Sequence, residues 1–128
     1  MIVADTSVWV AALRDEKSRT ARALTSLIDA DEVALPVPVR IELVSGVARK
    51  DRSKLKRALT ALPVLAATDE TWSLIEQWIE PAADAGQRFA ATDLLIAALA
   101  HEVDALVWSL DADFGRMERL KMTRLYEI

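Results

Sequence analysis

Five acidic residues stand where a sheet and its helices could bring their carboxylates together. The first directly follows an apolar run, the last two follow another apolar run, and the middle two lie in the first turns of predicted helices. Carboxylates gathered in this way repel one another, and a bound divalent cation makes such a cluster tolerable near neutral pH. These residues are Asp5, Glu42, Asp93, Asp111 and Asp113.

The cation that suits such a cluster is Mg²⁺ or Mn²⁺. Both take oxygen ligands and, when few carboxylates bind them, keep waters and positions for a substrate phosphate. One or two such ions can activate a water and stabilise the leaving oxygen of an in-line phosphodiester displacement. Phosphodiester hydrolysis is therefore a reaction that such a site is suited to perform.

The rare residues exclude several other kinds of site. The sequence has no Cys, which excludes disulfides and thiolate nucleophiles, and its three glycines lie too far apart for a phosphate-binding glycine loop. The only histidine is His101, near the end of a predicted helix, where we expect a surface residue without a catalytic role. Chemistry would have to come mainly from carboxylates, hydroxyls, Lys and Arg.

Each acid also has an ordinary alternative role when it is taken alone. Asp5 could be a turn or capping residue, and Glu42 could lie on an exposed helix face. Asp93 stands at a helix N-terminus, where the helix dipole favours an acid by roughly 0.3–1 kcal/mol. Asp111 and Asp113 could simply belong to a polar turn. The prediction of a site therefore depends on the five acids taken together and not on any one of them.

The alternation of short apolar runs and helical patterns predicts how these acids are positioned. Apolar runs predict strands over 1–4, 33–35, 64–66, 105–108 and 123–126. Helical spacing predicts helices over 8–13, 19–30, 69–80, 93–103 and 115–120, with two more beginning near 39 and 51. We expect one domain over residues 1–128, with an α/β fold in which helices flank a short, mainly parallel central sheet. Ligands of such sheets bind outside the carboxyl ends of the strands.

Four motifs occur in order over nearly the whole sequence. They are Ile2-Val3-Ala4-Asp5-Thr6-Ser7, Glu42-Leu43 with Gly46, Thr92-Asp93-Leu94-Leu95-Ile96-Ala97-Ala98, and Ser109-Leu110-Asp111-Ala112-Asp113-Phe114. With these motifs the chain resembles the PIN-domain ribonucleases. In its length and its N-terminal sequence it resembles a VapC-type toxin of a bacterial toxin–antitoxin pair. The resemblance implies a PIN-like fold and a metal-dependent endoribonuclease.

The resemblance also implies roles for individual residues. Asp5 and Asp93 would be the principal metal ligands, with Glu42 and Asp111 completing a four-carboxylate catalytic site that binds Mg²⁺ or Mn²⁺. Asp113 is a second candidate for the fourth acid, because the last acid of this family is the most variable. Hydroxyl groups would orient the site, and the residues that carry them are Thr6, Ser7 and Ser109. The implied partners are an RNA substrate, an antitoxin and a second copy of the chain in a homodimer.

Charge is unevenly distributed over the sequence. The formal net charge of −4 argues against a general polycationic surface for nucleic acid. Basic residues nevertheless gather in the stretches 49–57 and 116–124. Either stretch could contact phosphates or could be a solvated helix surface. The candidate RNA contacts are Lys54, Lys56, Arg57 and Arg116.

Neither a signal peptide nor a membrane span is expected. The start lacks a basic region and carries Asp5, and no apolar run approaches the roughly 20 residues that cross a bilayer. The expected location is therefore the cytoplasm.

Three other functions remain open from the sequence. A phosphoacceptor signalling domain would need adjacent acids after the first strand, which Asp5 lacks. A nuclease of the same fold that acts on DNA would show the same acids. A PIN-like module without catalysis would be expected to lack some of the four acids, and here all of them are present.

Overall fold

Five parallel strands form the centre of the molecule, in the order β3-β2-β1-β4-β5. The computed structural model describes residues 1–128. The strands are β1 (Ile2–Ala4), β2 (Val33–Pro36), β3 (Val64–Leu65), β4 (Leu106–Trp108) and β5 (Arg124–Leu125). Val3 of the central strand β1 pairs with Ala34 on one side and with Val107 on the other. The predicted α/β fold is confirmed, and its sheet is parallel throughout, not only mainly so.

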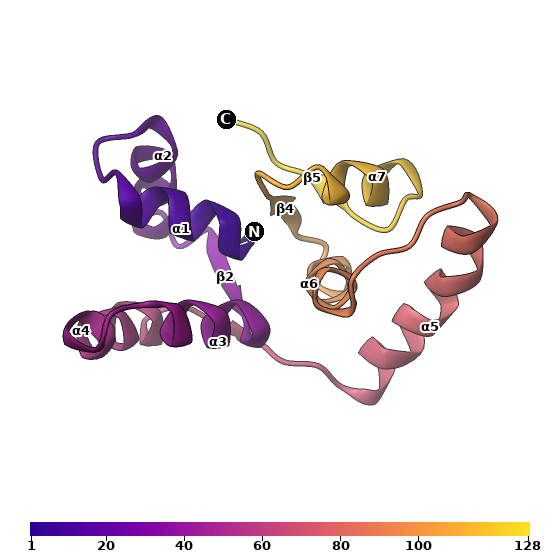
Figure 1. Ribbon diagram of the computed structural model, residues 1–128, viewed down its shortest axis with the longest axis horizontal. Coiled ribbons are helices and arrows are strands. Elements are labelled where there is room, and N and C mark those ends of the chain that lie inside the picture. Colours follow the sequence, from indigo (N-terminus) through magenta and orange to yellow (C-terminus); the bar gives the residue numbers. More distant parts are fainter.

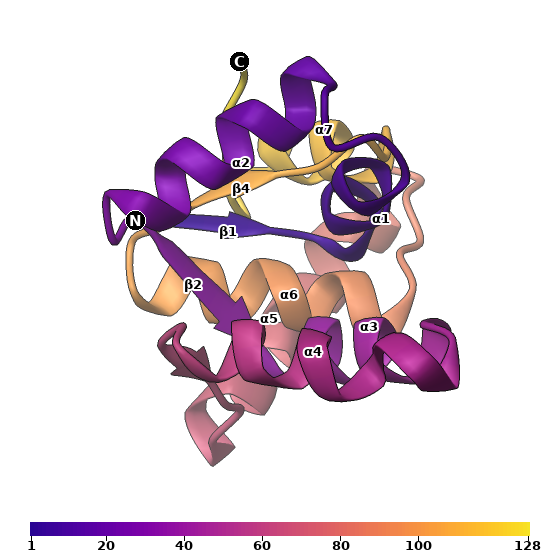
Figure 2. The ribbon, with the colours of Figure 1, turned by 90° about the vertical axis from the view of Figure 1, so that its left-hand side faces the viewer.

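Seven helices connect and cover these strands. They are α1 (Thr6–Arg14), α2 (Arg19–Asp29), α3 (Val37–Gly46), α4 (Arg49–Thr60), α5 (Asp69–Asp84), α6 (Ala91–Glu102) and α7 (Asp113–Arg119). Figure 1 shows α6 near the middle of the molecule, with α5 on its outer side. In Figure 2, β1 lies between α2 on one side and α6 on the other. Both faces of the sheet are thus covered, which explains why the central strands are apolar at every position.

Five helices (α1, α3, α4, α6 and α7) begin two residues before their predicted starts, and α5 ends four residues after its predicted end. Helix α5, predicted to end at residue 80, continues through Pro81 to Asp84. Proline has no N–H, so the carbonyl of Gln77 loses its helix bond, but Gln77 is exposed and water can hydrate this carbonyl. Ala82, beyond Pro81, packs into the core.

Helix α6, predicted to begin at residue 93, begins at Ala91, and its N-cap residue Ala90 makes no side-chain capping hydrogen bond. Six residues in the middle of α6, between Leu94 and Ala100, are buried, and their packing outweighs the missing cap.

The sheet and its connections bring several chain segments to one edge. Strand β1 ends at Ala4 and β4 ends at Trp108, and these two residues pair with each other. Asp5 and Ser109 therefore leave the sheet side by side. No helix is both long and apolar enough to cross a membrane.

Candidate active site

Asp5 occupies the point where β1 passes into α1, and it is only 5% exposed. Its Oδ1 accepts hydrogen bonds from the backbone N–H of Ser7 at 3.0 Å and from that of Val8 at 3.4 Å, and so caps the helix. The Ser7 hydroxyl also donates to Oδ1, and the Ser109 hydroxyl donates to Oδ2 at 2.6 Å. Both oxygens of this buried carboxylate are thereby oriented by short contacts.

The same two hydroxyls join the first and last parts of the site. Ser7 Oγ accepts the N–H of Leu110 at 3.0 Å, and Ser109 Oγ accepts the N–H of Asp111 at 2.9 Å. The loop that follows β4 is therefore tied to the start of α1, about a hundred residues earlier in the chain. The position of Asp111 relative to Asp5 depends on these bonds.

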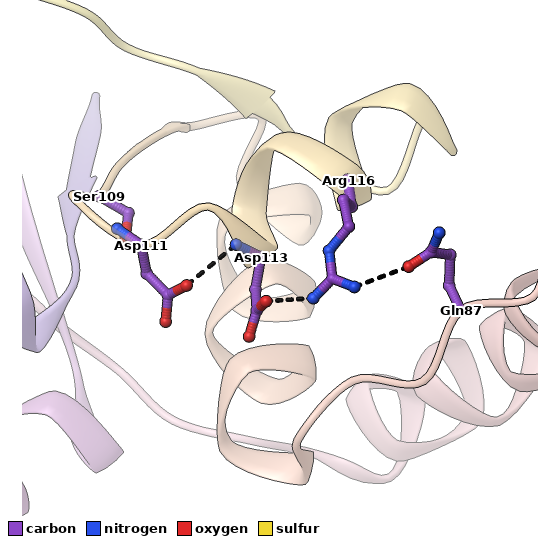
Figure 3. Close-up of polar contacts among 5 residues, drawn as sticks. All are labelled: Gln87, Ser109, Asp111, Asp113 and Arg116. Atoms are coloured by element: carbon purple, nitrogen blue, oxygen red, sulfur yellow. Dashed lines mark hydrogen bonds and ion pairs between the residues drawn. The ribbon is translucent and has the colours of Figure 1, made fainter.

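Asp93, Asp111 and Asp113 form the tightest group of acids. One carboxylate oxygen from each lies within 4.8 Å of those of the other two. Asp111 Oδ1 accepts the backbone N–H of Asp113 at 2.9 Å, which fixes the turn that begins α7 (Figure 3). Asp93 lies in the first turn of α6, so this helix and the turn that begins α7 together supply the group.

One pocket contains all four acids expected to be catalytic. Its walls come from the ends of β1 and β4 and from the helices α1, α3 and α6. Glu42, on the exposed face of α3, lines the pocket, whereas Asp113 does not. Thr92 and Ile96 line it without having been predicted as site residues. The lining residues are Asp5, Thr6, Ser7, Glu42, Thr92, Asp93, Ile96 and Asp111.

The electrostatics of this pocket favour a cation. Burial, and then the negative charges of the neighbouring carboxylates, raise the pKa of Asp93 to about 6. These neighbours are Asp111, Asp113, Asp5 and Glu42, in order of decreasing effect. No lysine or arginine lines the pocket. Carboxylate and hydroxyl oxygens are the donors that Mg²⁺ and Mn²⁺ prefer, so the residues present fit such an ion.

Thr6 supplies a second indication that the pocket is incomplete without a bound group. Its hydroxyl is buried at the pocket and has no hydrogen-bond partner in the protein. Buried hydroxyls are normally paired, and a water can supply the missing bond. A hydrated ion would bring such waters into this pocket.

The candidate RNA contacts lie elsewhere. Lys54, Lys56 and Arg57 are exposed on α4, form no ion pair and do not line the acidic pocket. Arg116 of α7 lies closer, but its guanidinium pairs with Asp113 and donates to Gln87 Oε1 at 2.8 Å. Gln87 was not predicted as a site residue, because it stands in an irregular segment outside every motif.

His101 stands at the other end of α6 from Asp93. Its Nδ1 lies 2.9 Å from the carbonyl oxygen of Met122, and its ring packs edge-on against Trp78 with centroids 5.5 Å apart. It has no contact with the acidic pocket. These contacts join α6 to α5 and to the segment before β5.

Replacing Ser109 by alanine should destabilise the protein by about 2 kcal/mol, because a buried carboxylate loses a charge-assisted hydrogen bond. Ser109→Thr should restore the hydroxyl and most of the stability. Urea unfolding would measure both variants. Ser45→Ala serves as the control, since the Ser45 hydroxyl makes only an exposed bond within α3. Equal losses for Ser109→Ala and Ser45→Ala would show that the bond to Asp5 does not orient the site.

Comparison with known proteins agrees with this geometry. The sequence model of the PIN domain matches residues 2–120. A search of curated proteins finds no significant match. Among solved structures, one similar chain belongs to VapBC2 from Rickettsia felis, which was crystallised with a DNA fragment from its promoter. That chain is 21% identical to this one, with a TM-score of 0.80. The match covers 98% of both chains.

Two further structures extend the comparison. FitAcB from Neisseria gonorrhoeae contains a chain that is 25% identical, with a TM-score of 0.79, covering 98% of this chain and 97% of that one. VapBC-5 from Mycobacterium tuberculosis, a member of the VapBC family of toxin–antitoxin systems, is 21% identical with a TM-score of 0.65. The match covers 98% of this chain and 97% of the VapBC-5 chain. The fold of these proteins extends over nearly the whole chain.

Proposed function

The chain belongs to the PIN-domain family, and from this membership we propose that it is a Mg²⁺- or Mn²⁺-dependent endoribonuclease. The observation that carries the proposal is the convergence of Asp5, Glu42, Asp93 and Asp111 in one pocket. The raised pKa of Asp93 supports it, because burial and then the neighbouring carboxylates disfavour the negative charge that a bound cation would neutralise. Receiver-type phosphoacceptor chemistry gains no support from this arrangement.

In the proposed mechanism the acids divide the work of holding the ion. Asp5 and Asp93 would hold the ion directly, and Glu42 and Asp111 would complete the acidic site directly or through water. The bound ion supplies Lewis acidity and charge neutralisation for phosphodiester hydrolysis. Ser7 and Ser109 keep both Asp5 oxygens oriented, and Thr6 offers its free hydroxyl to the pocket. Hydrolysis adds a water oxygen to phosphorus and releases one backbone oxygen, which leaves with a proton.

We also propose that the protein is the toxin of a toxin–antitoxin pair. The similar chain in VapBC-5 belongs to a toxin–antitoxin system, and FitAcB and VapBC2 share the same fold. A cognate antitoxin and a homodimer are the corresponding partners. Trp72 and Ile79 on the outer face of α5, exposed by 50% and 52%, offer an apolar stripe for a second subunit. As a single domain over residues 1–128, the toxin would act on RNA in the cytoplasm.

Cleavage of labelled RNA tests the enzymatic proposal. The purified protein should cut RNA with Mg²⁺ or Mn²⁺ and should stop when EDTA removes the ion. A DNA strand of the same sequence serves as the matched substrate. Efficient cleavage of the DNA and not of the RNA would favour a DNA nuclease, and cleavage of neither would favour a non-catalytic module. The Asp5→Asn variant must lose the activity for the pocket to be responsible.

Charge reversal on α4 should weaken RNA binding without affecting the pocket. Changing Lys54, Lys56 and Arg57 together to Glu should lower cleavage at low RNA concentration by roughly tenfold and reduce the salt slope of binding by about 2. Single-turnover cleavage over a series of salt concentrations would measure both effects. The matched control reverses three exposed charges near the start of α2: Lys17, Arg19 and Arg22. An unchanged salt slope in the α4 variant would exclude this helix from RNA binding.

A further inference from the structure

Arg116 is the only basic residue that forms an ion pair with an acid of the site. One arm of its guanidinium pairs with Asp113 Oδ1, and the other donates to Gln87 Oε1 at 2.8 Å (Figure 3). Its central carbon lies 5.3 Å from the centre of the Phe89 ring, over the ring face. The guanidinium is therefore held by an acid, an amide and an aromatic ring at once.

This arrangement separates two acids that are only two residues apart in the chain. Asp111 lines the pocket with Asp5, Glu42 and Asp93, whereas Asp113 does not. A carboxylate oxygen of Asp113 still comes within 4.8 Å of those of Asp93 and Asp111, close enough to share an ion with them. What distinguishes Asp113 is that one of its oxygens faces the guanidinium of Arg116.

The same contacts fix the segment that leads into α6. Gln87 and Phe89 lie just before the first residue of that helix, Ala91, and Phe89 is buried. Arg116 binds both from α7. The side chain of Arg116 therefore links the turn that contains Asp111 and Asp113 to the segment that leads into the helix of Asp93.

We propose that Arg116 is a positioning residue that withholds Asp113 from the cation. The ion then meets four carboxylates and not five. A fifth carboxylate would bind the ion more tightly but would occupy positions that waters and a substrate phosphate need. This inference depends on the proposed function, since it concerns the same ion.

Binding of Mn²⁺ alone to the metal-free protein, measured by calorimetry, tests the inference without any cleavage reaction. Arg116→Met should tighten Mn²⁺ binding by roughly three- to tenfold, because it releases Asp113 and removes a competing cation. The control is Arg119→Met, which removes an equal charge from the exposed face of the same helix and should change binding by less than about twofold. The double variant Arg116→Met with Asp113→Asn should return to the wild-type affinity, because it removes the pair as a whole.

Two results would overturn the inference. If the double variant binds Mn²⁺ at least about tenfold more weakly than the wild type, Asp113 is itself a ligand. If Arg116→Met binds no more tightly than Arg119→Met, the ion pair does not withhold Asp113. If Arg116→Met does not fold, the Mn²⁺ affinities of the single variants Asp111→Asn and Asp113→Asn test the inference instead. Asp111→Asn must weaken Mn²⁺ binding by the larger factor, and an equal or larger loss for Asp113→Asn would overturn the inference. A wild-type protein that binds no Mn²⁺ would instead contradict the proposed function.

Discussion

Asp93→Asn is expected to abolish RNA cleavage and, at the same time, to make the metal-free protein more stable at neutral pH. Activity should fall by about 10³-fold or more, because losing a direct ligand forfeits several kcal/mol of transition-state stabilisation by the ion. Stability should rise because the asparagine removes a charge that burial and four neighbouring carboxylates disfavour. A substitution that only damaged the fold would lower both quantities.

The stability gain should depend on pH in a defined direction. The pKa of Asp93 is raised from 3.8 in the unfolded chain to about 6 in the folded protein, so the folded state holds the proton more firmly. Wild-type stability therefore declines as pH rises through this window, and Asp93→Asn does not share the decline. The difference should vanish below about pH 4 and be complete above about pH 7. Because Asp93 is partly exposed, screening reduces the expected gain to about 1 kcal/mol.

Thermal melts in EDTA from pH 4 to pH 8, run beside single-turnover cleavage with Mn²⁺, would measure both effects. Glu76→Gln provides the control, since it removes a charge from the exposed side of α5, away from the pocket. It should leave cleavage unchanged and give no comparable pH-dependent gain. A stable Asp93→Asn variant that still cleaves RNA at the wild-type rate would refute the assignment of Asp93.

Phe114→Ala should have the largest effect on stability, about 3–5 kcal/mol. Phe114 is wholly buried and is the largest of the fully buried side chains. It directly follows Asp113 in α7, so the cavity would also loosen the turn that carries the last two acids. Because such a loss is a large share of a domain's usual stability, partial unfolding at 37 °C is expected.

Leu110→Ala is the matched control for this prediction. Leu110 lies in the loop that precedes α7 but is 57% exposed, and its replacement should change the unfolding free energy by no more than about 0.5 kcal/mol. Urea unfolding of both variants, followed by tryptophan fluorescence, gives the comparison. A small loss for Phe114→Ala would mean that α7 is not anchored in the core through this residue.

The strands and most helices could be predicted because their signals are local. Runs such as 1–4 and 105–108 are apolar throughout, as strands buried on both faces must be. The extent of α5 through Pro81 could not be predicted, since it depends on solvent around one carbonyl and on Ala82 packing beyond it. A local sequence pattern predicts the type of an element, but the residues at which it ends also depend on tertiary packing.

The acids of the pocket could be named from motifs, but the way they are held could not. Ser109 bonds to Asp5 across 104 positions of sequence, and no spacing rule predicts such a pair. The division between Asp111 and Asp113 is likewise invisible in the sequence. It depends on Arg116 and Gln87, which come together only when α7 packs beside the segment before α6.

The net charge of −4 also has a clearer meaning in the folded protein. Five of the acids gather at or beside one pocket that no basic residue lines. The exposed bases of α4 lie outside it. Such a distribution suits a site that needs a cation before it can accept a phosphate, and the sum alone does not reveal it.

The central claim is that these carboxylates bind a divalent cation, and a crystal soaked in Mn²⁺ tests it most directly. The anomalous difference map should contain a peak in the pocket, with oxygens of Asp5 and Asp93 within about 2.5 Å of it. The ion pair between Asp113 and Arg116 should remain intact. A saturating soak that leaves this pocket without a peak, or that places Mn²⁺ only elsewhere on the protein, would contradict the account.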